Sequence, residues 1–306
     1  MNAATDIADL PDTFTAAALS PGASRAADFY EMTKPRLNFL VLVTTAVGYY
    51  MAARSMGDWP RLLHVLLGAA LTAGGASVLN QLMERDYDKL MPRTRNRPLP
   101  AGRIAPVEAL LFGSFLGVVG VLYLFLFVNT LTALLGAITL LSYLFIYTPM
   151  KRYTTLNTVI GAVPGAIPPV MGWTAVHGAL SPEALSLFCI LFLWQMPHFL
   201  SIAILYRRDY AAGGFKMLPV VDRDLTITSR QIVLYSLALI PITLMPALMG
   251  MAGAVYFTVA MLLGLAFLSF AVSCAATRER VDARKLFFAS IIYLPVLLAA
   301  MMMNKL

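Results

Sequence analysis

Long apolar stretches separated by short polar segments fill the chain from residue 37 onward. An α-helix rises about 1.5 Å per residue, so about 20 apolar residues cross a hydrocarbon core of about 30 Å. Stretches close to that length lie at 37–54, 62–83, 107–128, 131–148, 157–176, 184–206, 231–250, 253–277 and 286–303. The pattern therefore predicts an all-α, polytopic membrane protein with nine transmembrane helices.

The lengths of the polar loops predict how these helices are grouped. Loops of about twenty residues follow the second and sixth stretches, whereas the loops after the third, fifth and seventh are short. This spacing predicts two four-helix halves plus a ninth helix around a central cavity, with both polar loops meeting over it. The chain shows no strong residue-level repeat, and a duplicated transporter would have the same pattern.

Composition and charge agree with a membrane protein and orient it. The 306 residues are 59% hydrophobic and 13% charged, with a mean hydropathy of +0.74. Of the 23 Lys and Arg, 20 lie before the first stretch or near the loops after the even-numbered ones. Loops rich in Lys and Arg stay in the cytoplasm. We therefore expect a bacterial inner membrane, a cytoplasmic amino terminus and a periplasmic carboxyl terminus, and no nucleic-acid binding despite the net charge of +7.

The first 28 residues differ from the rest of the chain. They are rich in Ala, Ser and Thr, and they lack the basic start and apolar core of a signal peptide. We expect a disordered cytoplasmic tail over 1–28 and one membrane domain over 29–306. Cys189 and Cys274 fall inside predicted helices without metal or redox spacing, which indicates packing roles.

The densest charge lies in NQLMERDYDKLMPRTRNRPLPAGR, residues 80–103. Asn80, Glu84 and Asp88 recur every four residues, so a helix would place them along one face. Their oxygens suit Mg²⁺, which takes one or two carboxylates plus waters and substrate phosphates. The alternative is a solvated helix end whose acids neighbour basic residues of the same helix.

Arginines follow these acids in a loop restrained by three prolines. Arginine binds phosphate through a planar, bidentate guanidinium. Arg93 and Arg97 are the candidate diphosphate ligands, and Arg95 is interpreted as surface charge. Retention of the loop in the cytoplasm also requires positive charge, but it requires no particular spacing.

This segment resembles the first signature of the UbiA superfamily of intramembrane aromatic prenyltransferases. That signature is Asn-Asp-x-x-Asp-x-x-x-Asp, followed by Arg-Thr and Arg-Pro-Leu. Asn80 and Asp88 match it, whereas Gln81 and Glu84 stand where it has its first two acids. A signature with glutamate at the position of Glu84 is similar to that of the haem O synthases, a family of protohaem IX farnesyltransferases.

Two later segments extend the resemblance. Tyr147 and Lys151 have the superfamily's Tyr-x-x-x-Lys spacing, which puts both side chains on neighbouring turns of a helix. An interfacial Tyr beside a snorkelling Lys is the alternative. Residues 206–219, YRRDYAAGGFKMLP, resemble the second signature, Asp-x-x-x-Asp. Gly213 replaces its second acid, so only Asp209 is carried over.

A polar group also lies inside the sixth apolar stretch, in WQMPHF. Polar side chains at that depth are costly unless they face a cavity or a partner. Three roles remain open for His198: a ligand to haem iron, a base that orients water, or a hydrogen-bond partner between helices. The string resembles the haem O synthases, which implies haem binding by Trp194, Gln195 and His198.

Two more segments are similar to the haem O synthases. NTVIGAVPGAIPPVMGW, residues 157–173, predicts a closely packed, kinked helix that either walls the acceptor pocket or serves packing alone. Lys34 and Arg36 stand directly before the first apolar stretch, and the resemblance implies that they contact the diphosphate.

The resemblance covers nearly the whole chain beyond residue 28. It implies transfer of a farnesyl group from farnesyl diphosphate to a vinyl group of haem B (protohaem IX), with addition of water, giving haem O and diphosphate. It also implies downstream partners, a haem A synthase or terminal-oxidase assembly factors. The implied Mg²⁺ ligands are Asn80, Glu84, Asp88 and Asp209, and the implied diphosphate ligands are Lys34, Arg36, Arg93, Arg97 and Lys151. The alternatives are a phenolic or quinone acceptor, or transport of a phosphorylated anion.

Overall fold

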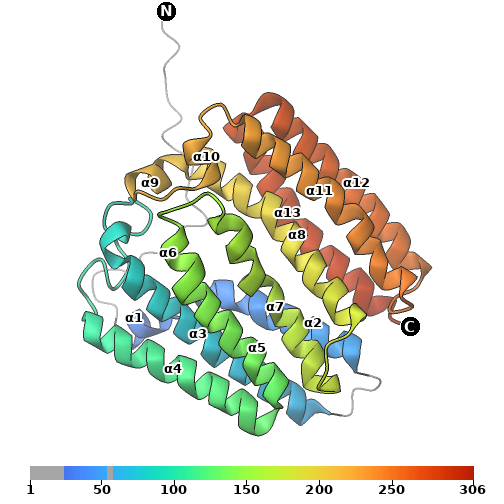
Figure 1. Cartoon of the computed structure of the whole chain (residues 1–306), viewed down its shortest axis with the longest axis horizontal. Helices are drawn as coiled ribbons and strands as arrows, with labels where there is room; N and C mark the ends of the chain where they lie inside the picture. The colour runs from blue at the N-terminus through green and yellow to red at the C-terminus, as the bar shows by residue number, and fades with distance from the viewer. Residues whose placement is uncertain (1–23, 54–57) are drawn as a thin grey trace, which may run out of the picture.

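The computed structural model describes residues 24–53 and 58–306, and every regular element within them is a helix (Figure 1). The long helices are α2 (Pro35–Ala52), α3 (Trp59–Asp88), α4 (Pro106–Phe127), α5 (Thr130–Leu141), α7 (Asn157–His177), α8 (Pro182–Leu205), α11 (Thr226–Leu248), α12 (Ala254–Thr277) and α13 (Arg280–Met303). The short ones are α1 (Arg25–Met32), the π-helix η1 (Ser142–Tyr147), α6 (Thr148–Met150), α9 (Arg207–Ala212) and α10 (Leu218–Val221).

Eight helical segments of the described residues are long and apolar enough to cross a membrane, with α5, η1 and α6 forming one of them. The chain is therefore a multi-pass membrane protein, and eight of the nine predicted spans are confirmed. The first predicted span coincides with α2, which is not among the eight. Pro35, Arg36 and Asn38 make the start of α2 polar.

Polar and proline residues set several helix starts. The side chain of Asn129 accepts a hydrogen bond from the backbone N–H of Thr132 at 2.8 Å and so caps α5. Its amide nitrogen donates to the carbonyl oxygen of Thr174 at 2.8 Å, which ties this cap to α7. Asp58 and Ser181 cap α3 and α8 in the same way, each followed by proline in the first helical turn.

The helices form two groups, joined by α7 and α8 (Figure 1). α3, α4 and α5 lie on one side, and α11, α12 and α13 lie on the other. Within the most apolar window of each helix, 72% of α7 and 61% of α8 is buried, against 22% of α4. The two central helices thus form the interior, and the outer helices turn apolar side chains outward, as lipid contact requires.

Glycines let α2 and α7 approach backbone to backbone. A Cβ atom on Gly48 would lie 2.0 Å from the carbonyl oxygen of Pro169, and one on Gly172 would lie 2.0 Å from that of Thr45. Both separations are far below contact distance, so only glycine fits. The close packing predicted for 157–173 is confirmed.

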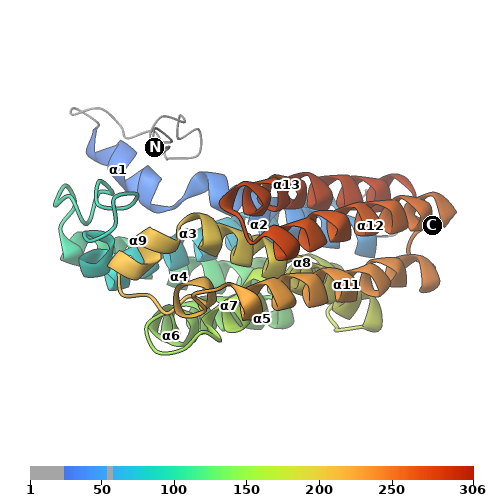
Figure 2. The same ribbon diagram turned by 90° about the horizontal axis from the view of Figure 1, so that it is seen from above.

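The two polar loops meet at one end of the molecule, as predicted. Met91 of the first loop packs in one apolar cluster with Phe215 and Met217 of the second. α1, the loop over 89–105 and α9 gather at this end, and the carboxyl terminus lies at the opposite end (Figure 2). The cavities that the structure gives lie beside α3 and α4 and beside α2, so the central cavity stays a prediction.

Most of the predicted tail, residues 1–23, lies outside the described residues. Its last four residues, 25–28, belong to α1, which begins at Arg25. Asp28 is buried and pairs with Arg103 at 2.9 Å. This ion pair fixes α1 against the first polar loop.

Candidate active site

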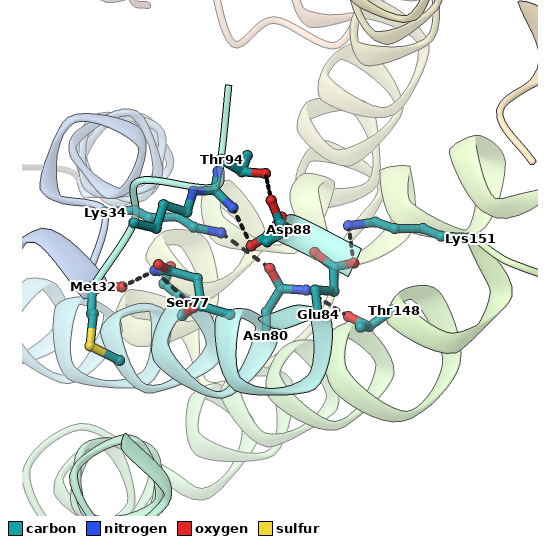
Figure 3. A network of polar contacts seen from close by, with 11 residues as sticks. Met32, Lys34, Ser77, Asn80, Glu84, Asp88, Thr94, Thr148 and Lys151 are labelled. Carbon is teal, nitrogen blue, oxygen red and sulfur yellow. Dashed lines mark hydrogen bonds and ion pairs between the residues drawn. The ribbon is translucent and has the colours of Figure 1, made fainter. Parts of the chain in front are cut away.

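The last three turns of α3 present a buried polar face at the end of the molecule where the loops meet (Figure 3). Asn80, Glu84 and Asp88 are 1%, 7% and 1% exposed. They lie one turn apart on the same helix, as the four-residue spacing predicts. The alternative of a solvated helix end does not hold, because these side chains are buried.

Each of the three side chains binds a different cationic residue. The amide oxygen of Asn80 accepts a hydrogen bond from Lys34 Nζ at 3.1 Å. Glu84 Oε1 lies 2.7 Å from Lys151 Nζ, and Asp88 Oδ2 lies 2.8 Å from Arg97 Nη1. These cations come from the start of α2, the end of α6 and the first polar loop. Residues 117 positions apart in sequence, from Lys34 to Lys151, thus meet at one site.

The pKa values of the two lysines shift in opposite directions. Burial, and after it the nearby Arg97 guanidinium, lower the pKa of Lys34 to about 7. Burial is also the largest single influence on Lys151 and opposes its charge, but the Glu84 carboxylate together with Tyr147 and Tyr143 outweighs it, and the pKa of Lys151 is raised well above its usual value. Lys151 therefore stays protonated at neutral pH, whereas Lys34, with a pKa of about 7, is protonated only in part.

The Tyr-x-x-x-Lys element is built on a π-helix. In η1, the backbone N–H of Thr148 donates to the carbonyl oxygen of Tyr143, five residues earlier, and the Thr148 hydroxyl donates to the same oxygen at 2.8 Å. Lys151 Nζ lies 4.6 Å from the centroid of the Tyr147 ring. The helix continues through Pro149, so Tyr147 and Lys151 lie on neighbouring turns, as the spacing predicts. The ammonium of Lys151 contacts the aromatic face of Tyr147.

Arg93 of the first polar loop contacts two aromatic rings of the second. Its guanidinium lies 4.9 Å from the ring centroid of Tyr206, directly before α9, and 5.8 Å from that of Tyr210 within α9. Asp209 lies on α9 between these tyrosines, half-buried, and the structure gives its carboxylate no bond to α3 among the described residues. Arg93 thus joins the first polar loop, which follows Asp88 at the end of α3, to α9, which carries Asp209.

The side chains on α3 supply only some of the ligands that a Mg²⁺ ion needs. Among residues 24–53 and 58–306, no three His, Cys, Asp or Glu side chains form a cluster that could hold a metal ion. Two buried carboxylates and one amide oxygen remain on α3, and Mg²⁺ completes such a set with waters and substrate phosphates. The residues therefore fit a metal that arrives with a phosphorylated substrate.

His198, Trp194 and Gln195 lie on α8; His198 and Trp194 face α13, whereas Gln195 faces α7. His198 Nδ1 lies 2.7 Å from Ser290 Oγ on α13, so the predicted helix-to-helix hydrogen bond is present. Gln195 donates to the Leu191 carbonyl at 3.1 Å. It also fills the space beside Gly165 of α7, where a Cβ would lie 2.1 Å from the amide oxygen of Gln195.

Other predicted residues that the structure describes have no contact with the polar face of α3. Arg36 is exposed on the first turn of α2, and Arg95 is exposed in the first loop, as its interpretation as surface charge predicts. The structure adds Thr148, whose hydroxyl accepts a hydrogen bond from Asn80 at 3.1 Å, and Thr94, whose hydroxyl donates to the Asp88 carbonyl at 2.9 Å. Both stand beside motif residues in sequence, which is the signal that could have found them.

Comparison with known proteins gives a family for this arrangement. Residues 41–292 match the model of the UbiA prenyltransferase family. The chain is 48% identical to a protoheme IX farnesyltransferase of Solibacter usitatus over 91% of this chain and 98% of the relative. It is 46% identical to one of Myxococcus xanthus over 92% and 95%, respectively.

Solved structures give the same fold at low identity. A digeranylgeranylglyceryl phosphate synthase has a TM-score of 0.75 at 17% identity, over 91% of this chain and 98% of that one. A UbiA homologue from Archaeoglobus fulgidus, bound to GPP and Mg²⁺, has a TM-score of 0.65 at 16% identity, over 90% and 99%.

Proposed function

The chain belongs to the UbiA prenyltransferase family, and we propose that it transfers a farnesyl group from farnesyl diphosphate to a vinyl group of protohaem IX. Water adds in the same reaction, and the products are haem O and diphosphate. The relatives that match nearly the whole chain at 46–48% identity are protoheme IX farnesyltransferases. That likeness supports haem as acceptor over a phenol or a quinone.

The buried polar face of α3, with its three cationic partners, is the observation that carries the diphosphate half of the proposal. Lys34, Arg97 and Lys151 converge on one face from three different segments. A diphosphate leaving group needs positive charge already in place as its C–O bond breaks. Arg97 and Lys151 supply that charge, Lys34 adds to it in its protonated form, and Arg97 can bind phosphate oxygens through two N–H groups.

In the proposed reaction, the C–O bond of farnesyl diphosphate breaks and diphosphate leaves with the electron pair. The allylic cation bonds to the terminal vinyl carbon, and water adds to the neighbouring carbon with loss of a proton. No protein nucleophile is required. The protein's residues hold the diphosphate at the polar end of the site, and the aromatic face of Tyr147, beside Lys151, can stabilise positive charge.

Mg²⁺ belongs to the proposal as well. Asn80, Glu84, Asp88 and Asp209 are the residues that would hold it, and when bound it neutralises charge on the leaving diphosphate. The A. fulgidus homologue of the same fold was solved with GPP and Mg²⁺, which supports a metal-dependent prenyl diphosphate site in this family.

The proposal is tested by incubating the purified protein with farnesyl diphosphate, Mg²⁺ and either haem B or a phenolic acceptor. We expect a farnesylated, hydrated haem by mass spectrometry in the first mixture and no prenylated phenol in the second. A prenylated phenol without a haem product would overturn the acceptor. Movement of intact diphosphate across vesicles without cleavage would favour a transporter.

A further inference from the structure

Ser290 of α13 is a fully buried residue that makes two contacts with α8. It is 0% exposed. Its Oγ lies 2.7 Å from His198 Nδ1, and its carbonyl oxygen accepts a hydrogen bond from Trp194 Nε1 at 2.9 Å. One residue of α13 thus holds two side chains of α8 that stand one helical turn apart.

The direction of the hydrogen bond to His198 follows from the other bond of the same hydroxyl. Ser290 Oγ donates to the carbonyl oxygen of Phe287 at 2.5 Å. A serine hydroxyl has one proton to donate, so Ser290 Oγ accepts the hydrogen bond from His198. The hydrogen of the neutral imidazole is therefore on Nδ1, and Nε2 has a bare lone pair.

Two aromatic rings stack on the His198 imidazole, and Ser290 occupies its Nδ1. Trp194 stacks at 4.8 Å between centroids and an interplanar angle of 18°. Phe287 stacks at 5.3 Å and 27°. Within the described residues no hydrogen bond involves Nε2, and the side chain is half-buried.

We propose that Ser290 is a positioning residue that holds His198 as the Nδ1–H tautomer, so that Nε2 is available to the iron of the haem acceptor. The inference rests on the proposed function. A histidine that binds a metal commonly donates its other ring N–H to an oxygen acceptor, which fixes both tautomer and orientation. Ser290 supplies that acceptor, and the hydrogen bond between α8 and α13 serves the site as well as the fold.

The tautomer can be measured without haem. The chain has three histidines, so ¹⁵N-histidine NMR of the purified protein can be assigned by comparison with His198→Ala. We expect a protonated Nδ1 and a bare Nε2 for His198, and a loss of this preference in Ser290→Ala. A hydrogen on Nε2 in the unmodified protein would overturn the inference, and so would an unchanged tautomer in Ser290→Ala.

Ser236→Ala is the matched control. Ser236 is 1% exposed, and its hydroxyl donates to the Ile232 carbonyl at 2.8 Å within α11. The substitution removes an equally buried hydroxyl that has no contact with His198. The ¹⁵N signals of His198 should not change.

A haem titration followed by absorbance separates this inference from the proposed function. We expect His198→Ala to abolish a histidine-ligated spectrum and Ser290→Ala to weaken haem binding by about 10-fold or more. Ser290→Cys keeps the shape with a much weaker acceptor and should resemble Ser290→Ala. Diphosphate binding should be unchanged in all three.

The outcomes of the titration are distinct. If His198→Ala leaves the spectrum unchanged, iron ligation fails, whatever Ser290 does. If His198→Ala changes it and Ser290→Ala does not, the role of Ser290 is wrong, while the proposed function stands.

Discussion

At the scale of single residues, the acids of α3 are neutralised by cations of the protein when no substrate is bound. Asp88 is buried against Arg97, and Glu84 against Lys151. Binding of Mg²⁺ with a diphosphate would give both partners of each pair a new counter-ion. The site can therefore exchange internal ion pairs for substrate contacts without exposing a buried charge.

Asp88→Ala tests the acidic half of this site. We expect the rate of transfer to fall by at least about 10²-fold, because a preformed electrostatic contact to the leaving group is lost. Diphosphate binding that depends on Mg²⁺ should weaken, as measured by calorimetry. Asp86→Ala is the control, since its carboxylate is 63% exposed and pairs with Lys89 at 3.3 Å. Equal loss in both variants would remove Asp88 from the site.

Lys151→Ala tests the buried pair with Glu84. Removing one partner of a buried ion pair costs about 3–5 kcal/mol, because the remaining charge has no counter-ion. We expect a large fall in the thermal midpoint in detergent and a loss of transfer. Adding Glu84→Gln should restore much of the midpoint but not the activity. A double variant no more stable than the single one would show that the pair is not what stabilises this region.

The residue spacing predicted the face formed by Asn80, Glu84 and Asp88, because helical periodicity fixes it. It could not predict their partners. Lys34, Lys151 and Arg97 reach them only through packing of α2, α3 and α6, and Ser290 meets His198 across 92 positions. Such pairings depend on helix contacts that no local pattern encodes.

At the scale of elements, α7 is the helix whose sequence most constrains its packing. Its glycines admit the backbone of α2 at one end and the side chains of Tyr147 and Gln195 at the other. A Cβ on Gly161 would lie 2.4 Å from the Tyr147 ring. The Gly and Pro content predicted this close packing. It did not predict η1, because a π-helix depends on a single extra residue per turn.

Gly172→Ala tests the contact between α2 and α7. Its new Cβ would lie 2.0 Å from the Thr45 carbonyl oxygen, so the helices must separate. We expect a loss of stability of about 1–3 kcal/mol or more, seen as a lower thermal midpoint. Gly74→Ala in α3 is the control, since its Cβ would meet Leu116 and Thr33 at 3.7 Å, an ordinary contact. A Gly172→Ala midpoint as high as that of Gly74→Ala would contradict the close approach.

At the scale of the whole molecule, the apolar pattern predicted the helices and the polar loops predicted which end holds the site. The number of membrane spans differs from the prediction at α2, whose polar start places Lys34 beside Asn80. Which end faces the cytoplasm follows from the alternation of Lys and Arg and stays a prediction.

Labelling of intact cells with an impermeant thiol reagent tests that orientation, in a variant whose two native cysteines are replaced. Asn96→Cys lies in the exposed first polar loop, and Leu306→Cys lies at the opposite end. We expect labelling of position 306 in intact cells and of position 96 only after lysis, because the basic loops stay inside. The reverse pattern would invert the topology.

The most direct measurement is the mass spectrum of the haem recovered after the purified protein is incubated with farnesyl diphosphate, Mg²⁺ and haem B, with Asp88→Ala in parallel. The proposed function predicts haem carrying one farnesyl group and one added water from the unmodified protein, and unmodified haem B from Asp88→Ala. Haem B returned unchanged by the unmodified protein, or equal product from both proteins, would contradict it.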